Sequence, residues 1–126
     1  MDHCPPFQAF FSPMLHLAHE GEINVRQSAE TIADILGLSA IAKLEKTNGG
    51  AIKRYLDRTM WAATYLRQAG LINTSRRGFV IISPEGKAFL EKHPEDISIT
   101  DLQEIEAFVH FQNRRRPNAA PSALGL

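Results

Sequence analysis

The residues best able to contact another molecule are cations gathered in one part of the chain. Of the 126 residues, 14 are Lys or Arg and 14 are Asp or Glu, so the formal net charge is zero. The segment 53–77 nevertheless has a net charge of +5, and the rest of the chain has −5. Its charged residues are Lys53, Arg54, Asp57, Arg58, Arg67, Arg76 and Arg77. Such a segment can present a positive potential to phosphate groups, although a solvated helix face followed by a basic loop gives the same pattern.

The spacing of these cations favours nucleic acid. Arg54 and Arg58 are four residues apart, so in a helix they project from one face. An arginine can donate two parallel hydrogen bonds to guanine, a contact worth about 1–3 kcal/mol of discrimination between bases. Arg76 and Arg77 lie in a predicted loop, where they are suited to contact phosphate or the minor groove. We therefore expect the DNA-binding residues to be Lys53, Arg54, Asp57, Arg58, Trp61, Arg76 and Arg77.

Trp61 has two interpretations. On the polar side of the same predicted helix, it can contact a base or the DNA backbone. It can equally pack at the edge of the core beneath the preceding loop, and packing is the favoured of the two.

A nuclease site is not predicted. Glu85-Gly86-Lys87 has the letters of the Glu-x-Lys pattern, in which carboxylates on adjacent strands hold magnesium near a lysine. Here the triplet begins a predicted helix, and the nearest preceding acid, Asp57, belongs to another helix. The match is therefore interpreted as accidental, and we expect no catalytic residues.

No metal site or cofactor is predicted either. His16 and His19 have a spacing that can bind metal, but no second cysteine or nearby acid pair completes four ligands. Cys4 has no histidine evidently placed to activate it, and one cysteine cannot form an internal disulfide. With no apolar run long enough to cross a membrane and no signal peptide, we expect a cytoplasmic protein.

Seven helical or hairpin elements are predicted. Apolar spacing indicates a first helix over 7–19, in which Pro13 causes a kink or a restart with Ser12 as a cap. Asn24 followed by Gln27 opens a second helix that stops at Gly37. Ser39 caps a short third helix through Leu44, and a long helix runs from about Ala51 to Ala69 before Gly70. The apolar runs 71–74 and 79–82 flank the loop 75–78, which is typical of a β-hairpin.

The last third of the chain predicts two more helices. Ser83-Pro84 opens one that His93-Pro94 ends. Thr100, with Gln103, caps the other, whose apolar stripe is Leu102, Ile105, Phe108 and Val109. If this stripe folds over the first helix it is core, and if it is exposed it favours a dimer. The predicted domain spans 1–112, and 113–126 is a flexible basic and Pro/Ala-rich tail or linker.

Three helices followed by a hairpin are typical of a winged helix-turn-helix. The predicted fold class is therefore mainly α with a small β-hairpin. In that fold the helix before the hairpin lies in the major groove, and the hairpin loop contacts the flanking DNA.

From Phe7 to about Phe111 the sequence resembles the N-terminal domain of Mrr-type restriction proteins. The residues that carry this resemblance are Pro13-Met14-Leu15, the segment from Ile32 to Ser39, the segment from Arg58 to Ile72, Arg77-Gly78-Phe79, the segment from Ile82 to Gly86, and Leu90. The resemblance implies a winged helix that binds DNA and is joined to a C-terminal nuclease that cuts modified DNA. The segment Leu44–Gly49 departs from the Leu-Pro-Ser-Gly-like loop of the family, and the sequence stops at Leu126, where the nuclease would begin.

The leading hypothesis is a non-catalytic module that recognises double-stranded DNA, which can carry modified bases. A C-terminal nuclease domain in a longer chain is the expected partner, and a stand-alone relative is the alternative. A winged-helix module for protein interaction or homodimerisation, or a stand-alone transcription regulator, remains a second hypothesis.

Overall fold

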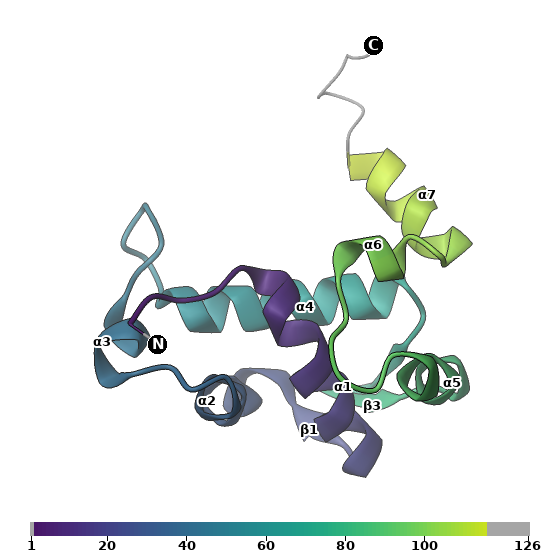
Figure 1. Cartoon of the computed structure of the whole chain (residues 1–126), viewed down its shortest axis with the longest axis horizontal. Helices are drawn as coiled ribbons and strands as arrows, with labels where there is room; N and C mark the ends of the chain where they lie inside the picture. The colour runs from purple at the N-terminus through teal and green to yellow at the C-terminus, as the bar shows by residue number, and fades with distance from the viewer. Residues whose placement is uncertain (1, 116–126) are drawn as a thin grey trace.

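The computed structural model describes residues 2–115 and is mainly helical with one small sheet (Figure 1). This confirms the predicted fold class. The elements in chain order are η1 (Phe7–Phe10), α1 (Phe11–Glu20), β1 (Ile23–Asn24), α2 (Val25–Ile35), α3 (Ala40–Leu44), α4 (Arg54–Gln68), β2 (Ile72–Arg76), β3 (Phe79–Ile82), α5 (Pro84–Lys92), α6 (Ile99–Leu102) and α7 (Glu106–Arg115).

The hairpin belongs to a three-stranded antiparallel sheet with the order β1-β3-β2. Ile23 of β1 pairs with Val80 of β3, and Ile72 of β2 pairs with Ile82 of β3. The two-residue strand β1 was not predicted, because it is too short to show an alternating pattern. Its pairing ties the start of α2 to the hairpin.

Side-chain caps fix the predicted helix starts. The side chains of Asn24, Ser39 and Ser83 accept hydrogen bonds from backbone N–H groups of α2, α3 and α5, at 2.9, 3.1 and 2.9 Å. Gly37 and Gly70 follow α2 and α4 with φ of 77° and 80°, the left-handed conformation that ends a helix. These starts and stops confirm the sequence prediction.

The long helix α4 begins at Arg54, three residues later than predicted. Lys46 and Lys53 form an antiparallel bridge, and the N–H of Thr47 donates to the carbonyl of Ile52 at 3.0 Å. The chain between α3 and α4 is therefore a closed loop, which Figure 1 shows projecting from the body of the molecule.

The first predicted helix is split, as expected, near Pro13. A short 3-10 turn precedes α1, and Pro13 falls in the first turn of α1, where no helical N–H is needed. Ser12 does not cap the helix. Its hydroxyl donates to the carbonyl of Glu95 at 2.6 Å, so the predicted cap is wrong.

The core joins the N-terminal segment, α4 and α7. Tyr65 of α4 lies within aromatic contact of several rings, with centroids 4.8 Å from Phe7 and 5.4 Å from Phe111. Phe11 and Phe108, which are fully buried, also contact Tyr65. This aromatic cluster holds the N-terminal segment against one side of α4.

The C-terminal stripe is mostly core. Leu102 and Phe108 have no exposed surface, and Ile105 and Val109 are half-buried. The stripe therefore gives no support for the dimer hypothesis.

The predicted cap Thr100 is wrong. Ser98 forms a capping box with Asp101 instead, α6 ends at Leu102, and α7 begins at Glu106. Helix α7 continues to Arg115, past the predicted domain end at residue 112. Most of the predicted tail lies outside the described residues.

Candidate nucleic-acid interface

One exposed side of α4 carries few charges. Asp57, Met60, Trp61 and Thr64 line a single shallow hollow on this helix. They follow one another at spacings of three, one and three residues, and Arg67 lies three residues after Thr64. We call the four residues that line the hollow the Met60 face. Met60 and Trp61 are each 40% exposed, although both are large apolar side chains.

The Met60 face is continuous with the hairpin turn through the start of α2. Arg26 of α2 points its Nη1 toward the Sδ of Met60 at 3.9 Å. The N–H of Val25 donates to the carbonyl of Gly78 at 3.0 Å. Asn24, Val25, Arg26, Gln27, Met60 and Gly78 line a second shallow hollow. Helix α4, the first turn of α2 and the hairpin turn therefore form one surface.

The expected exposure of Arg54 is wrong. Its Nε forms an ion pair with Glu45 Oε2 at 3.1 Å, and its Nη2 donates to the carbonyl of Lys46 at 2.9 Å. The same Nη2 donates to Asn48 Oδ1 at 3.2 Å. The side chain is 23% exposed and holds the loop between α3 and α4.

Arg58 is also turned toward its own chain. Its Nη1 donates to the carbonyls of Cys4 and Pro5, and the residue is half-buried. Among the described residues, these two carbonyls accept no backbone hydrogen bond from a helix or strand, so they are available to the guanidinium. The N–H of Cys4 in turn donates to Glu45 Oε1 at 3.0 Å. The predicted open face of two arginines is thus covered, at Arg58 by the N-terminal segment and at Arg54 by the loop before α4.

The thiol of Cys4 lies under this cover. Burial raises the pKa of Cys4, and the Arg58 guanidinium partly opposes that rise. The hydrogen bond from the Cys4 N–H lowers the pKa of Glu45.

Arg76 lies in β2 rather than in the loop, so its predicted place at the hairpin tip is wrong. Its guanidinium stacks 3.7 Å from the centre of the Phe79 ring and forms an ion pair with Glu22 at 3.2 Å. The hydroxyl of Ser75 also donates to Glu22. These two donors lower the pKa of Glu22, with Ser75 the larger cause. Arg76 remains 64% exposed, but its charge is partly neutralised.

Four cations are exposed on the elements that form this surface or at the ends of α4. Arg77 lies in the turn of the hairpin, Arg26 in the first turn of α2, and Lys53 and Arg67 at the two ends of α4. Within residues 2–115, Arg77, Lys53 and Arg67 have no ion pair with an acidic side chain. Sequence reasoning missed Arg26 and Met60. The Asn24 cap could have indicated Arg26, because it places this residue in the first turn of α2.

Trp61 lies at the edge of the aromatic core and is also partly exposed. Its ring meets Tyr65 edge to face at 6.2 Å, so it borders the aromatic core. The exposed part of the ring lines the hollow of the Met60 face.

Comparison with known proteins establishes the family. The family described as "Mrr N-terminal domain" matches residues 7–92, which is more than half of the chain. The chain belongs to the Mrr N-terminal domain family. It is also similar to the type IV methyl-directed restriction enzyme EcoKMrr of Escherichia coli strain K12, with 30% identity over 118 residues. The aligned region covers 91% of this chain and 38% of that enzyme. No solved structure matches the chain.

The Glu-x-Lys triplet of this Mrr N-terminal domain lies in the first turn of α5, as predicted. A Cβ added to Gly86 would lie 2.0 Å from the carbonyl oxygen of Leu71. The glycine is therefore required for α5 to pack against the chain that leads into β2. Glu85 and Lys87 are exposed on either side of it.

His16 makes a hydrogen bond through Nε2 with the carbonyl of Pro94 at 2.8 Å, and His19 is exposed.

Among the described helices, none has the length and apolar character needed to cross a membrane.

Proposed function

We propose that this chain is a DNA-recognition module of a restriction enzyme. The observation that carries the proposal is the continuity of the Met60 face with the start of α2 and the hairpin turn. In a winged helix, one duplex contacts the helix before the hairpin and the hairpin loop together. Membership of the Mrr N-terminal domain family supports this use of the surface. We infer that the cutting domain lies elsewhere in a longer chain, because the chain spans 38% of its restriction-enzyme relative.

The proposed contacts differ from those expected from the sequence. Arg77, Arg26, Lys53 and Arg67 contact phosphates, because their charges are exposed. Arg76 adds a weaker contact, since Glu22 competes for its guanidinium. Arg54 and Arg58 position α4 and do not contact bases, because their donors are used within the chain.

Met60 and Trp61 give the surface an apolar centre that suits a methyl group in the major groove. Apolar side chains contact the thymine methyl group, and a methylated cytosine presents a similar group. The similar enzyme of Escherichia coli is methyl-directed by name, so we extend the proposal to methylated DNA.

Binding titrations on methylated and unmethylated duplexes at two salt concentrations test the proposal. Arg77→Ala should weaken binding to every sequence alike and reduce the log–log salt slope by about 0.9, the loss of one phosphate contact. Lys87→Ala is the matched control, because Lys87 is an exposed cation on α5 outside the surface. Binding that is equally weakened by both variants, or unchanged by Arg77→Ala, would contradict the proposed contact.

A second function, contact with a partner protein, is supported by the apolar surface of α3. Ile41 and Leu44 are 69% and 65% exposed and three residues apart. Light scattering of the wild type and of Ile41→Glu/Leu44→Glu tests for self-association through this helix. If the wild type is monomeric at all concentrations, the chain does not self-associate through α3.

A further inference from the structure

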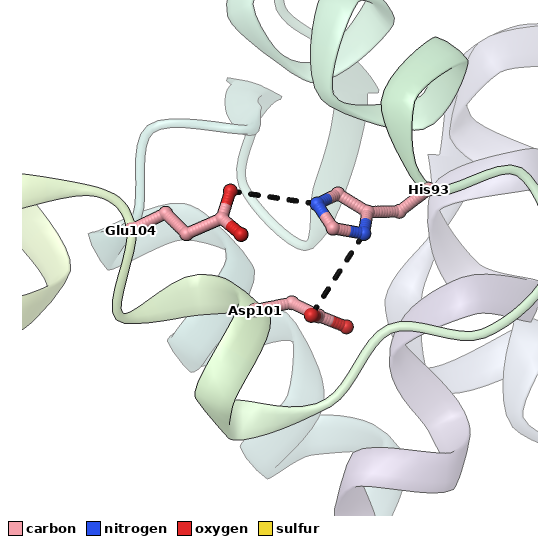
Figure 2. Close-up of side chains that lie close together, drawn as sticks. All are labelled: His93, Asp101 and Glu104. Carbon is pink, nitrogen blue, oxygen red and sulfur yellow. Dashed lines mark ion pairs between the residues drawn. The ribbon is translucent and has the colours of Figure 1, made fainter.

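A histidine and two carboxylates lie together on a part of the molecule that the proposed DNA surface does not include. His93 follows the last residue of α5, Asp101 belongs to α6, and Glu104 lies in the turn before α7. Figure 2 shows both carboxylates directed at the imidazole ring. One possible ligand atom from each residue lies within 4.8 Å of the other two. The sequence did not reveal this cluster, because its members are not spaced as a metal-binding motif.

The two ring nitrogens have different neighbours. Nε2 of His93 lies 3.5 Å from Glu104 Oε1, and Nδ1 lies 3.8 Å from Asp101 Oδ1. Nε2 is buried and has no hydrogen-bond partner within the described residues. Two ligands of a tetrahedral zinc ion, each about 2.1 Å from the metal, are about 3.4 Å apart. The pair formed by Nε2 and Glu104 already has this separation.

The ring of His93 is held in place by its surroundings. It packs on the ring of Phe89, with centroids 4.6 Å apart, and its side chain is 16% exposed. Asp101 Oδ2 accepts a hydrogen bond from the N–H of Ser98 at 2.9 Å, which leaves Oδ1 for the histidine. A histidine that binds metal commonly donates its other ring N–H to such a carboxylate, which fixes the tautomer.

We propose that this cluster binds a divalent transition metal ion of the Zn²⁺ type. Nε2 of His93 and the carboxylate of Glu104 are the protein ligands, and water completes the coordination. Asp101 is a positioning residue, whose Oδ1 faces Nδ1 of the ring at 3.8 Å. The bound ion joins the end of α5 to the turn before α7 and so stiffens the C-terminal part of the domain.

One neighbouring cation competes with the metal. Nζ of Lys92 lies 3.0 Å from Glu104 Oε1, and this ion pair lowers the pKa of Glu104. The Lys92 side chain is 67% exposed, so it can move into solvent when an ion binds. A purely structural network would be weakened by removal of Lys92, whereas a metal site would bind its ion more tightly.

Calorimetric titration of the full chain with ZnCl₂ near pH 7 tests the proposal. Wild type should bind one ion, and His93→Gln and Glu104→Gln should lose this binding. Asp101→Asn should weaken it about 10- to 100-fold, the usual effect of removing the carboxylate partner of a ligand histidine. Lys92→Met should bind more tightly than wild type. Circular dichroism of each variant checks that it is folded.

Two control variants locate the ion. Glu91→Gln removes an exposed carboxylate of α5, and His16→Gln/His19→Gln removes two other histidines. Both variants should bind zinc as the wild type does. No zinc binding by wild type would overturn the proposal. So would undiminished binding by folded Glu104→Gln, or binding by Lys92→Met that is no tighter than that of wild type. The test is independent of DNA binding, so its outcome does not depend on the proposed function.

Discussion

The two sides of α4 differ in a way that their composition does not reveal. One side carries Arg54 and Arg58, which are bound to the loop before the helix and to the N-terminal segment. The other side, the Met60 face, is less charged and open, and it adjoins the hairpin turn. A cation is available to a ligand only where the chain leaves its donors unused. On this helix Arg54 and Arg58 support the structure, and the apolar side chains of Met60 and Trp61 form the exposed centre.

The largest expected effect comes from a substitution on the covered side of α4, which should lower the stability of the fold. Arg58→Ala leaves the carbonyls of Cys4 and Pro5 without their charged donor and releases the N-terminal segment from α4. A hydrogen bond to a charged group contributes about 1.5–3 kcal/mol. Because both bonds share Nη1 and the residue is only half-buried, we expect the free energy of unfolding to fall by about 2 kcal/mol in total. Urea denaturation measures this, with Arg67→Ala, an exposed arginine of the same helix, as the control. Comparable loss in both variants would contradict the structural role of Arg58.

A charge placed on the open side should act on binding alone. Met60→Glu puts a carboxylate at the centre of the proposed DNA surface, so DNA affinity should fall at least tenfold, about 1.4 kcal/mol. The side chain is 40% exposed, so the free energy of unfolding should change little. Fluorescence anisotropy with a labelled duplex, beside a urea titration, separates the two quantities. If Met60→Glu binds DNA with the affinity of the wild type, the duplex does not lie on the Met60 face.

The smallest expected effect is a dependence of the covered side on pH. The hydrogen bond from the Cys4 N–H lowers the folded pKa of Glu45, so Glu45 stabilises the folded state above its ordinary pKa. That contribution is lost as the pH falls from about 4.3 through the lower folded value, and the N-terminal segment then detaches first. NMR titration of the Glu45 carboxyl should give the lowered pKa, and Arg58→Ala should bring it nearer to the ordinary one. An unperturbed Glu45 pKa in the wild type would show that the segment is not held.

Local signals predicted most of the fold. The caps Asn24, Ser39 and Ser83 and the stops Gly37 and Gly70 act through neighbouring backbone groups, so they can be recognised along the chain. The predicted Ser12 cap was wrong because a distant partner had taken the residue. The hydroxyl of Ser12 donates to the carbonyl of Glu95, which is not visible in local spacing.

The candidate interface was predicted only in part. Spacing identified the helix and hairpin that form it, and Arg77 stays a predicted contact that the exposed turn supports. Residue spacing could not show that Arg76 pairs with Glu22, because these residues meet only when β1 and β2 flank β3. Nor could it select Met60 over Arg58, because spacing does not show which side of α4 the N-terminal segment covers.

By itself, the sequence determined the order of the main elements, several helix ends and the family, because these depend on contacts within a few residues or on similarity along the chain. The tertiary structure decided which cations are exposed, which side of α4 is open and which titratable groups meet beside α5. These depend on contacts that local spacing does not show, such as those of the N-terminal residues with α4 and of Glu104 with His93. Their charges interact over a few ångströms in space, and only the folded chain sets those distances.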